Sequence, residues 1–167
     1  MMQDALETGI ALCNYYDEGW GALCRKGRDA NGYGDDLVEA AAAALRRYWQ
    51  EADIQIGGVV CVPSLRRPAL VPDFAKRLAA ALGLPFAAVI EHEQQHSPQS
   101  DMRNSFQQAV NVWGRYTLRQ RLKGKPVLLV DDIADSKWTL TVVGDLLQRH
   151  GSGKVYPFVL AATNTAE

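Results

Sequence analysis

Apolar and polar positions change along this chain in blocks that predict strands and helices in turn. Short apolar runs at 57–62, 85–90, 127–130 and 155–161 are bounded by polar residues, glycine or proline, which is typical of buried strands. Helices are predicted between or before these runs at 37–49, 72–82 and 140–149. Strands that alternate with helices are joined by right-handed crossovers. We therefore expect an α/β fold with an open, mainly parallel sheet and helices on both faces.

The N-terminal part of the chain follows a different pattern. Residues 10–16 and 21–26 are short apolar stretches around a polar, glycine-containing turn, and they predict a β-hairpin. A loop is expected at 27–34, because this stretch is rich in glycine and contains Asn31-Gly32. The predicted units are an N-terminal hairpin and helix at 1–50 and a core at 51–167.

The most informative stretch begins with the apolar run 127–130. Asp131 and Asp132 follow it directly, and after a short polar turn Thr139 opens a helical pattern. Carboxylates at the end of a parallel strand can bind ribose hydroxyls or a hydrated magnesium ion, and a helix N-terminus offers free N–H groups to a phosphate. The same residues also fit a plain strand end with Ser136 or Thr139 as the N-cap of the helix, and the pattern leaves both interpretations open.

Two further polar segments follow predicted strands. The segment after 57–62 carries arginines, whose guanidinium groups match phosphate oxygens. Its candidate anion-binding residues are Ser64, Leu65, Arg66 and Arg67. The segment 91–120 is long and polar, and connections of that length inside a domain are usually functional or mobile. Because ligands bind at the carboxyl ends of strands in such sheets, these segments and the acidic pair should meet at one edge.

Composition narrows the classes of function. The chain has 167 residues, of which 47% are hydrophobic and 22% charged, as in a soluble single domain. The net charge of −1 gives no general electrostatic reason to bind nucleic acid, so DNA contact would need a local basic patch. No apolar run approaches the ~20 residues of a membrane span. Three cysteines without metal-ligand spacing favour a reduced, cytoplasmic protein.

Residues 127–139, Val-Leu-Leu-Val-Asp-Asp-Ile-Ala-Asp-Ser-Lys-Trp-Thr, resemble the phosphoribosyl diphosphate (PRPP) signature of type I phosphoribosyltransferases. The resemblance implies that Asp131 and Asp132 hold ribose hydroxyls, or Mg²⁺ that arrives with the ligand. It assigns the 5′-phosphate to Ser136, Lys137, Trp138 and Thr139, and the pyrophosphate to the arginine loop. It also places a flap over the reacting centre in the middle segment, with Gln99, Asn104 and Asn111 as its candidate residues.

The same resemblance bears on catalysis. Asp135 matches the aspartate that handles a ring proton of the base in purine phosphoribosyltransferases. Lys137 stands where the family has a glycine that lets the backbone approach the 5′-phosphate. The purine enzymes also form a hood over the base from a segment beyond the last strand, whereas the candidate hood of this chain lies within residues 1–50. Catalysis therefore does not follow from the resemblance.

Residues 61–68, 135–144 and 151–160 resemble, more narrowly, the phosphoribosyltransferase-like C-terminal domain of bacterial RecQ-type DNA helicases, and the chain is more distantly similar to ComF-like proteins. This resemblance implies an accessory domain for DNA repair that binds PRPP or a nucleotide, with a helicase core in the same or another chain as a partner. The alternatives are an active, Mg²⁺-dependent phosphoribosyltransferase and a DNA- or protein-docking module with a vestigial pocket. Clustered basic residues would favour the docking module: Arg46, Arg47, Arg115, Arg119, Arg121, Lys123 and Lys125.

Overall fold

Four parallel strands form the central sheet of the protein. The structure is a computed structural model, and it describes residues 6–62, 67–86, 90–91, 116–117, 123–134 and 138–163. The strands are β1 (Ile10–Asn14), β2 (Gly58–Cys61), β5 (Val127–Ala134) and β6 (Val155–Ala162), and their order in the sheet is β1-β6-β5-β2. All three pairings are parallel, so the four carboxyl ends lie along one edge of the sheet.

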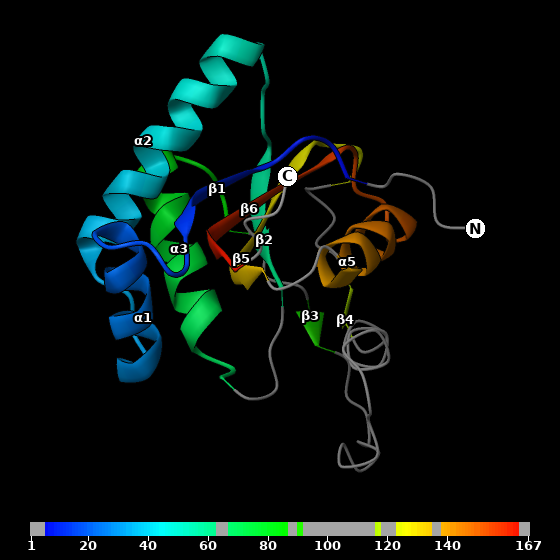
Figure 1. Cartoon of the computed structure of the whole chain (residues 1–167). Helices are drawn as coiled ribbons and strands as arrows, with labels where there is room; N and C mark the ends of the chain where they lie inside the picture. Colours follow the sequence, from blue (N-terminus) through cyan, green and yellow to red (C-terminus); the bar gives the residue numbers. More distant parts are fainter. Residues whose placement is uncertain are drawn as a thin grey trace.

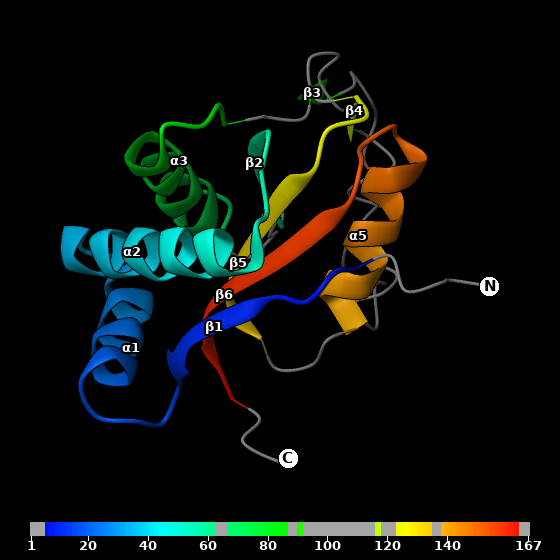
Figure 2. The same cartoon turned by 90° about the horizontal axis from the view of Figure 1, so that it is seen from above.

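Helices cover both faces of this sheet (Figures 1 and 2). Helices α1 (Trp20–Ala30), α2 (Asp35–Ala52) and α3 (Leu70–Leu82) lie on one side, and α5 (Trp138–Arg149) lies on the other. The predicted open, parallel α/β fold is therefore confirmed. In the described parts of the chain, no helix is both long and apolar enough to cross a membrane.

The central place of β5 between two layers of helices explains why its sequence is apolar at every position from Val127 to Val130. Val127 and Leu129 belong to the core cluster beneath α5, while Leu128 and Val130 belong to the cluster beneath the other three helices. A strand that is covered on both faces has no solvent side, so its apolar residues run without interruption. All four side chains are fully buried as a result.

The predicted N-terminal hairpin is wrong. Strand β1 pairs in parallel with β6, from Ile10 opposite Phe158 to Asn14 opposite Ala162. The second arm of the predicted hairpin lies in α1, which also takes up the first half of the predicted loop 27–34. Gly21, Cys24 and Gly27 are the buried residues of α1, so its inner face has helical spacing but little of the bulk that marks a hydrophobic pattern.

The N-terminal elements share their core with the rest of the fold. Cys24, Tyr33 and Leu37 belong to the same buried cluster as Phe74 of α3 and Phe158 of β6. The structure thus places both sides of the predicted boundary at residue 50 in one hydrophobic core. The role of residues 1–50 as a hood stays a prediction.

The predicted helices 37–49, 72–82 and 140–149 and the predicted strands 57–62 and 155–161 agree with the structure to within a few residues. Helix α3 ends at Gly83, whose φ of 72° is the left-handed conformation that glycine adopts most easily. The predicted strand 85–90 begins beside β2, where Phe86 forms a parallel bridge with Val59. Its end, β3 (Ile90–Glu91), instead pairs antiparallel with β4 (Tyr116–Thr117) in a separate two-stranded sheet.

Candidate functional site

The sequence predicted that the acidic pair follows the strand, but the structure places both aspartates inside β5. Pairing with β6 continues past Val130, with Asp131 opposite Val159 and Ala134 opposite Ala162. On the other side, the ladder with β2 stops at Cys61, which is opposite Val130. The two aspartates therefore stand where one neighbouring strand has ended, at the carboxyl edge of the sheet. This is the edge at which ligands bind in open α/β folds.

Each carboxylate accepts a hydrogen bond from the backbone of the residue that follows it. The N–H of Asp132 donates to Asp131 Oδ1 at 2.8 Å, and the N–H of Ile133 donates to Asp132 Oδ1 at 2.7 Å. Aspartate side chains commonly compete with regular structure for nearby N–H groups in this way. One oxygen of each carboxylate is thereby fixed, and the two Oδ2 atoms have different surroundings.

The Oδ2 atom of Asp132 accepts a hydrogen bond from the Tyr33 hydroxyl at 2.8 Å. Tyr33 lies in the short connection between α1 and α2, and only 3% of it is exposed. Its ring meets the ring of Phe74 edge to face, with 5.7 Å between the ring centroids. A phenol and a carboxylate that are far apart in the sequence therefore meet at the carboxyl edge of the sheet.

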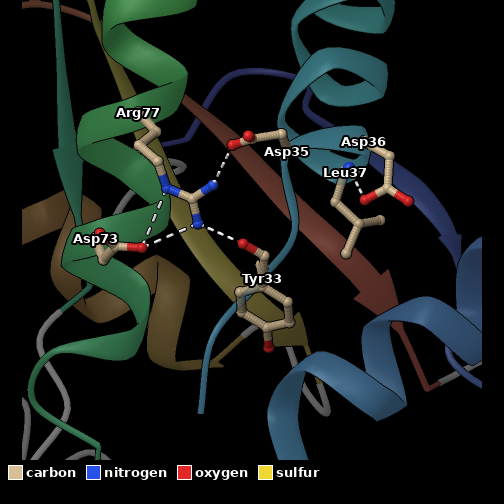
Figure 3. Close-up of polar contacts among 6 residues, drawn as sticks. All are labelled: Tyr33, Asp35, Asp36, Leu37, Asp73 and Arg77. Carbon is tan, nitrogen blue, oxygen red and sulfur yellow. Dashed lines mark hydrogen bonds and ion pairs between the residues drawn. The ribbon is translucent and has the colours of Figure 1, made fainter. Parts of the chain in front are cut away.

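Arg77 of α3 holds the connection that carries Tyr33 (Figure 3). Its guanidinium donates to Asp73 Oδ2 at 2.9 and 3.1 Å and to Asp35 Oδ1 at 2.9 Å. It also donates to the backbone carbonyl of Tyr33. With 31% of its side chain exposed, Arg77 joins α3 to the start of α2 and to the connection before it.

Burial sets the protonation of the groups around the acidic pair. Burial, followed by the charge of Asp132, raises the pKa of Asp131 well above its usual value, and Arg28 opposes this shift weakly. Burial and then the charge of Asp132 raise the pKa of Tyr33, so its hydroxyl stays a neutral hydrogen-bond donor. Burial and then the charge of Asp131 raise the pKa of Cys61 to about 12. The carboxyl edge of the sheet thus carries a half-buried pair of carboxylates that favours a partner with hydroxyl donors or a cation.

Several predicted site residues lie outside the described residues. They are Ser64, Leu65 and Arg66 of the arginine loop, Asp135, Ser136 and Lys137 of the phosphate loop, and Gln99, Asn104 and Asn111 of the flap. Trp138 and Thr139 form the first residues of α5, so a helix does begin where the phosphate loop was predicted to end. Arg67 lies just ahead of α3, where its carbonyl accepts from the N–H of Leu70 at 3.3 Å.

Tyr33 and Arg77 were missed by the sequence analysis. One signal could have pointed to Tyr33, since it is a single aromatic residue between Gly32 and Gly34 in an otherwise polar connection. An aromatic side chain in such a place usually packs on something. The spacing of Asp73 and Arg77 on α3 indicates an ion pair within the helix. No local signal points to the contacts of Arg77 with Tyr33 and Asp35, because these residues lie far away in the sequence.

The acidic pair can offer a magnesium ion the oxygens of only two carboxylates. The described residues contain no group of three or more His, Cys, Asp or Glu side chains that could hold a metal ion. Mg²⁺ commonly binds through one or two carboxylates together with the phosphates of its substrate. Asp131 and Asp132 fit that kind of shared site and do not form a cage by themselves.

Comparison with known proteins gives three findings. Residues 35–167 match the family model described as "phosphoribosyl transferase domain". An adenine phosphoribosyltransferase of known structure is 21% identical, with a TM-score of 0.50 over 77% of this chain and 71% of that chain. A purine phosphoribosyltransferase from Pyrococcus horikoshii is 20% identical, with a TM-score of 0.49 over 80% and 76% of the two chains. No curated protein sequence matches the chain. At 21% identity, the likeness to the adenine phosphoribosyltransferase bears on the fold alone.

Proposed function

Because the chain belongs to the phosphoribosyl transferase domain family, we propose that it binds a phosphoribosyl ligand, PRPP or a nucleotide, at the carboxyl edge of its sheet. The observation that carries the proposal is the place of the acidic pair. Asp131 and Asp132 stand beyond the end of β2, on the strand that leads to the start of α5. The carboxylates accept hydrogen bonds from the ribose hydroxyls, and the α5 N-terminus faces the 5′-phosphate.

The proposed ligand makes sense of the electrostatics of the pair. Burial raises the pKa of Asp131, and repulsion from the neighbouring Asp132 carboxylate raises it further. Ribose hydroxyls or a Mg²⁺ ion would relieve that repulsion by donating hydrogen bonds or positive charge. We propose that Mg²⁺ enters with the ligand and is shared between these carboxylates and ligand phosphates.

The other predicted residues complete the proposed site. The 5′-phosphate is assigned to Ser136, Lys137, Trp138 and Thr139, and the pyrophosphate to Ser64, Leu65, Arg66 and Arg67. Gln99, Asn104 and Asn111 are the proposed flap, and Asp135 is the proposed general acid or base if the domain transfers the ribosyl group. These assignments rest on the resemblance of residues 127–139 to the PRPP signature.

We propose further that the domain serves as an accessory or regulatory unit of a RecQ-like DNA helicase system. What supports this is the similarity of residues 61–68, 135–144 and 151–160 to the C-terminal domain of such helicases. The ligand would then regulate a helicase core in the same or another chain. A pull-down of purified helicase core by this domain, with and without PRPP, tests this role separately from ligand binding.

Isothermal titration calorimetry tests the ligand. PRPP, nucleoside monophosphates and a short single-stranded oligonucleotide are titrated in turn, with and without Mg²⁺. We expect PRPP or a monophosphate to bind and the Mg²⁺ arm to bind PRPP more tightly. If no phosphoribosyl ligand binds at millimolar concentration, the proposal fails. Binding of the oligonucleotide alone would favour the docking module instead.

The same samples distinguish a binding domain from an enzyme. Release of pyrophosphate from Mg²⁺-PRPP is measured across a panel of nucleobases. A turnover that Asp135→Asn abolishes, without loss of PRPP affinity, would assign the protein to active phosphoribosyltransferases. Binding without release in every arm would leave it an accessory domain.

A further inference from the structure

Asp132 has a defined partner on each of its carboxylate oxygens before any ligand arrives. The N–H of Ile133 donates to Oδ1 at 2.7 Å, and the Tyr33 hydroxyl donates to Oδ2 at 2.8 Å. Each carboxylate oxygen has two lone pairs, so both oxygens can still accept from a ligand hydroxyl. The two bonds fix the plane of the carboxylate, and hence the direction of the lone pairs that remain.

Tyr33 is itself held in place from several directions. Arg77 binds its carbonyl, and Phe74 packs against its ring. Gly27 lies so close that a Cβ atom at this position would be 2.6 Å from Tyr33 Cδ1. Arg77 thus holds the backbone of Tyr33, while Phe74 and Gly27 restrict the movement of its ring. A buried, confined donor keeps its hydrogen bond where a solvent-exposed one would exchange it with water.

We propose that Tyr33 is a positioning residue, which orients the Asp132 carboxylate toward the ribose hydroxyls of the phosphoribosyl ligand. Arg77 supports it by joining α3 to the connection between α1 and α2. This inference rests on the proposed function, since it names the residue that prepares the same site. It adds Tyr33 to the site, and Tyr33 lies just before the family match, which begins at residue 35.

The arrangement works by preparing the acceptor before the ligand binds. A carboxylate that turns freely must be ordered when the ligand arrives, and that ordering weakens binding. With Tyr33 in place, the carboxylate is already ordered when the protein folds, so ligand binding does not have to order it. The gain in affinity concerns the ribose hydroxyls, because they bind to Asp132 and Tyr33 orients Asp132. Binding of a phosphate group elsewhere in the site is independent of it.

Tyr33→Phe is the variant that tests this, because it removes the hydroxyl and keeps the ring against Phe74. Affinities for Mg²⁺-PRPP and for Mg²⁺-pyrophosphate, which lacks the ribose, are compared by calorimetry. We expect the PRPP affinity to fall about tenfold, as for loss of a hydrogen bond to a charged group, and the pyrophosphate affinity to stay the same. The matched control is Tyr48→Phe, since the Tyr48 hydroxyl donates to the Thr8 carbonyl at 3.3 Å on the exposed side of α2.

A second variant keeps the test decisive if Tyr33→Phe does not fold. Arg77→Gln leaves the phenol intact and loosens the segment that carries it, so a smaller loss confined to PRPP is expected. Its control is Arg149→Gln, which breaks a comparable ion pair with Asp145 (2.7 Å) at the far end of α5.

The outcomes separate this inference from the proposed function. If the wild-type protein does not bind PRPP, the proposed function fails and the inference fails with it. If the wild type binds PRPP and Tyr33→Phe binds it equally well or more tightly, only the inference fails. An equal loss of PRPP and pyrophosphate affinity would also overturn it, because that loss would reflect a general structural defect.

Discussion

Asp131 and Asp132 are neighbours in the sequence but have different surroundings. Asp132 receives hydrogen bonds from Tyr33 and from the backbone, whereas Asp131 receives one from the backbone and lies close to Cys61. Burial and the adjacent charge raise the pKa of Asp131. The pair thus combines one carboxylate that is fixed in direction with one that is costly to ionise. A ligand that stabilises the ionised form of Asp131 therefore binds more tightly, because it relieves the unfavourable interactions of that charge.

The raised pKa of Asp131 gives a prediction about stability. A carboxyl with a higher pKa in the folded than in the unfolded state stabilises the fold most below its unfolded pKa of 3.8. This stability is lost as the pH rises from there through the raised folded pKa. Asp131→Asn removes the ionisation, so at pH 7 we expect a higher Tm, by roughly 2–4 °C for each kcal/mol gained.

Thermal unfolding of wild type and variant between pH 4 and pH 8 measures this effect. The difference in Tm should grow with pH, and PRPP binding should be lost at the same time. Asp29→Asn, an exposed position on α1, is the control that should change neither quantity. A variant that is less stable than wild type at every pH would show that the Asp131 carboxylate is well solvated.

At the scale of elements, the connection between α1 and α2 packs tightly against the end of α1, next to the site. Helix α1 ends with Asn31 in the left-handed conformation, at φ 58°, which turns the chain toward Tyr33. The Gly32 N–H then donates to the Gly27 carbonyl at 2.9 Å. The turn and the end of the helix are thus tied together, and Gly27 is the residue that leaves space for the Tyr33 ring.

Gly27→Ala should destabilise the protein even though alanine favours helices. Alanine improves helix propensity by about 1 kcal/mol, but its Cβ would lie 2.6 Å from Tyr33 Cδ1 and 2.9 Å from the backbone oxygen of Gly32. Overpacking of this kind costs typically 1–3 kcal/mol, because buried backbone has to move. We expect a net loss of about 1 kcal/mol in urea unfolding. Gly32→Ala is the matched control, since its Cβ would meet nothing within 4 Å. An equal effect of both substitutions would contradict the packing argument.

The elements that the sequence predicted well are those whose own residues carry the signal. Strand β5 and helix α3 have buried faces of bulky side chains, so their apolar pattern is strong. Helix α1 buries glycine and cysteine, which give a weak pattern, and strand β1 finds its partner in β6 near the other end of the chain. Aspartate is rare in strands, which is why β5 was expected to end at Val130. The acidic pair was found from its local motif, but the Tyr33 bond to Asp132 depends on the assembled fold.

At the scale of the whole molecule, the N-terminal elements are part of the core that supports the site. Strand β1 closes the β6 edge of the sheet, and α1 with Tyr33 covers the face to which Asp132 points. The family match begins at residue 35 and omits both. Without β1 (5 residues), the longer strand β6 (8 residues) would become the edge of the sheet, and long exposed edges are prone to association with other chains. We therefore expect the fold of this protein to depend on residues that precede the family match.

A shortened chain that consists of residues 35–167 tests this dependence. It lacks the partner of β6 and loses Cys24 and Tyr33 from the core, together with the half-buried Ile10 and Leu12 that pack against it. At roughly 1–5 kcal/mol for each buried side chain, this loss is of the same size as the ~5–15 kcal/mol stability typical of a domain. We expect the shortened chain to aggregate or to unfold without cooperativity, as measured by size-exclusion chromatography and by circular dichroism during heating. Cooperative unfolding at the Tm of the full chain would show instead that residues 35–167 fold independently and that β1 and α1 are an addition to a complete domain.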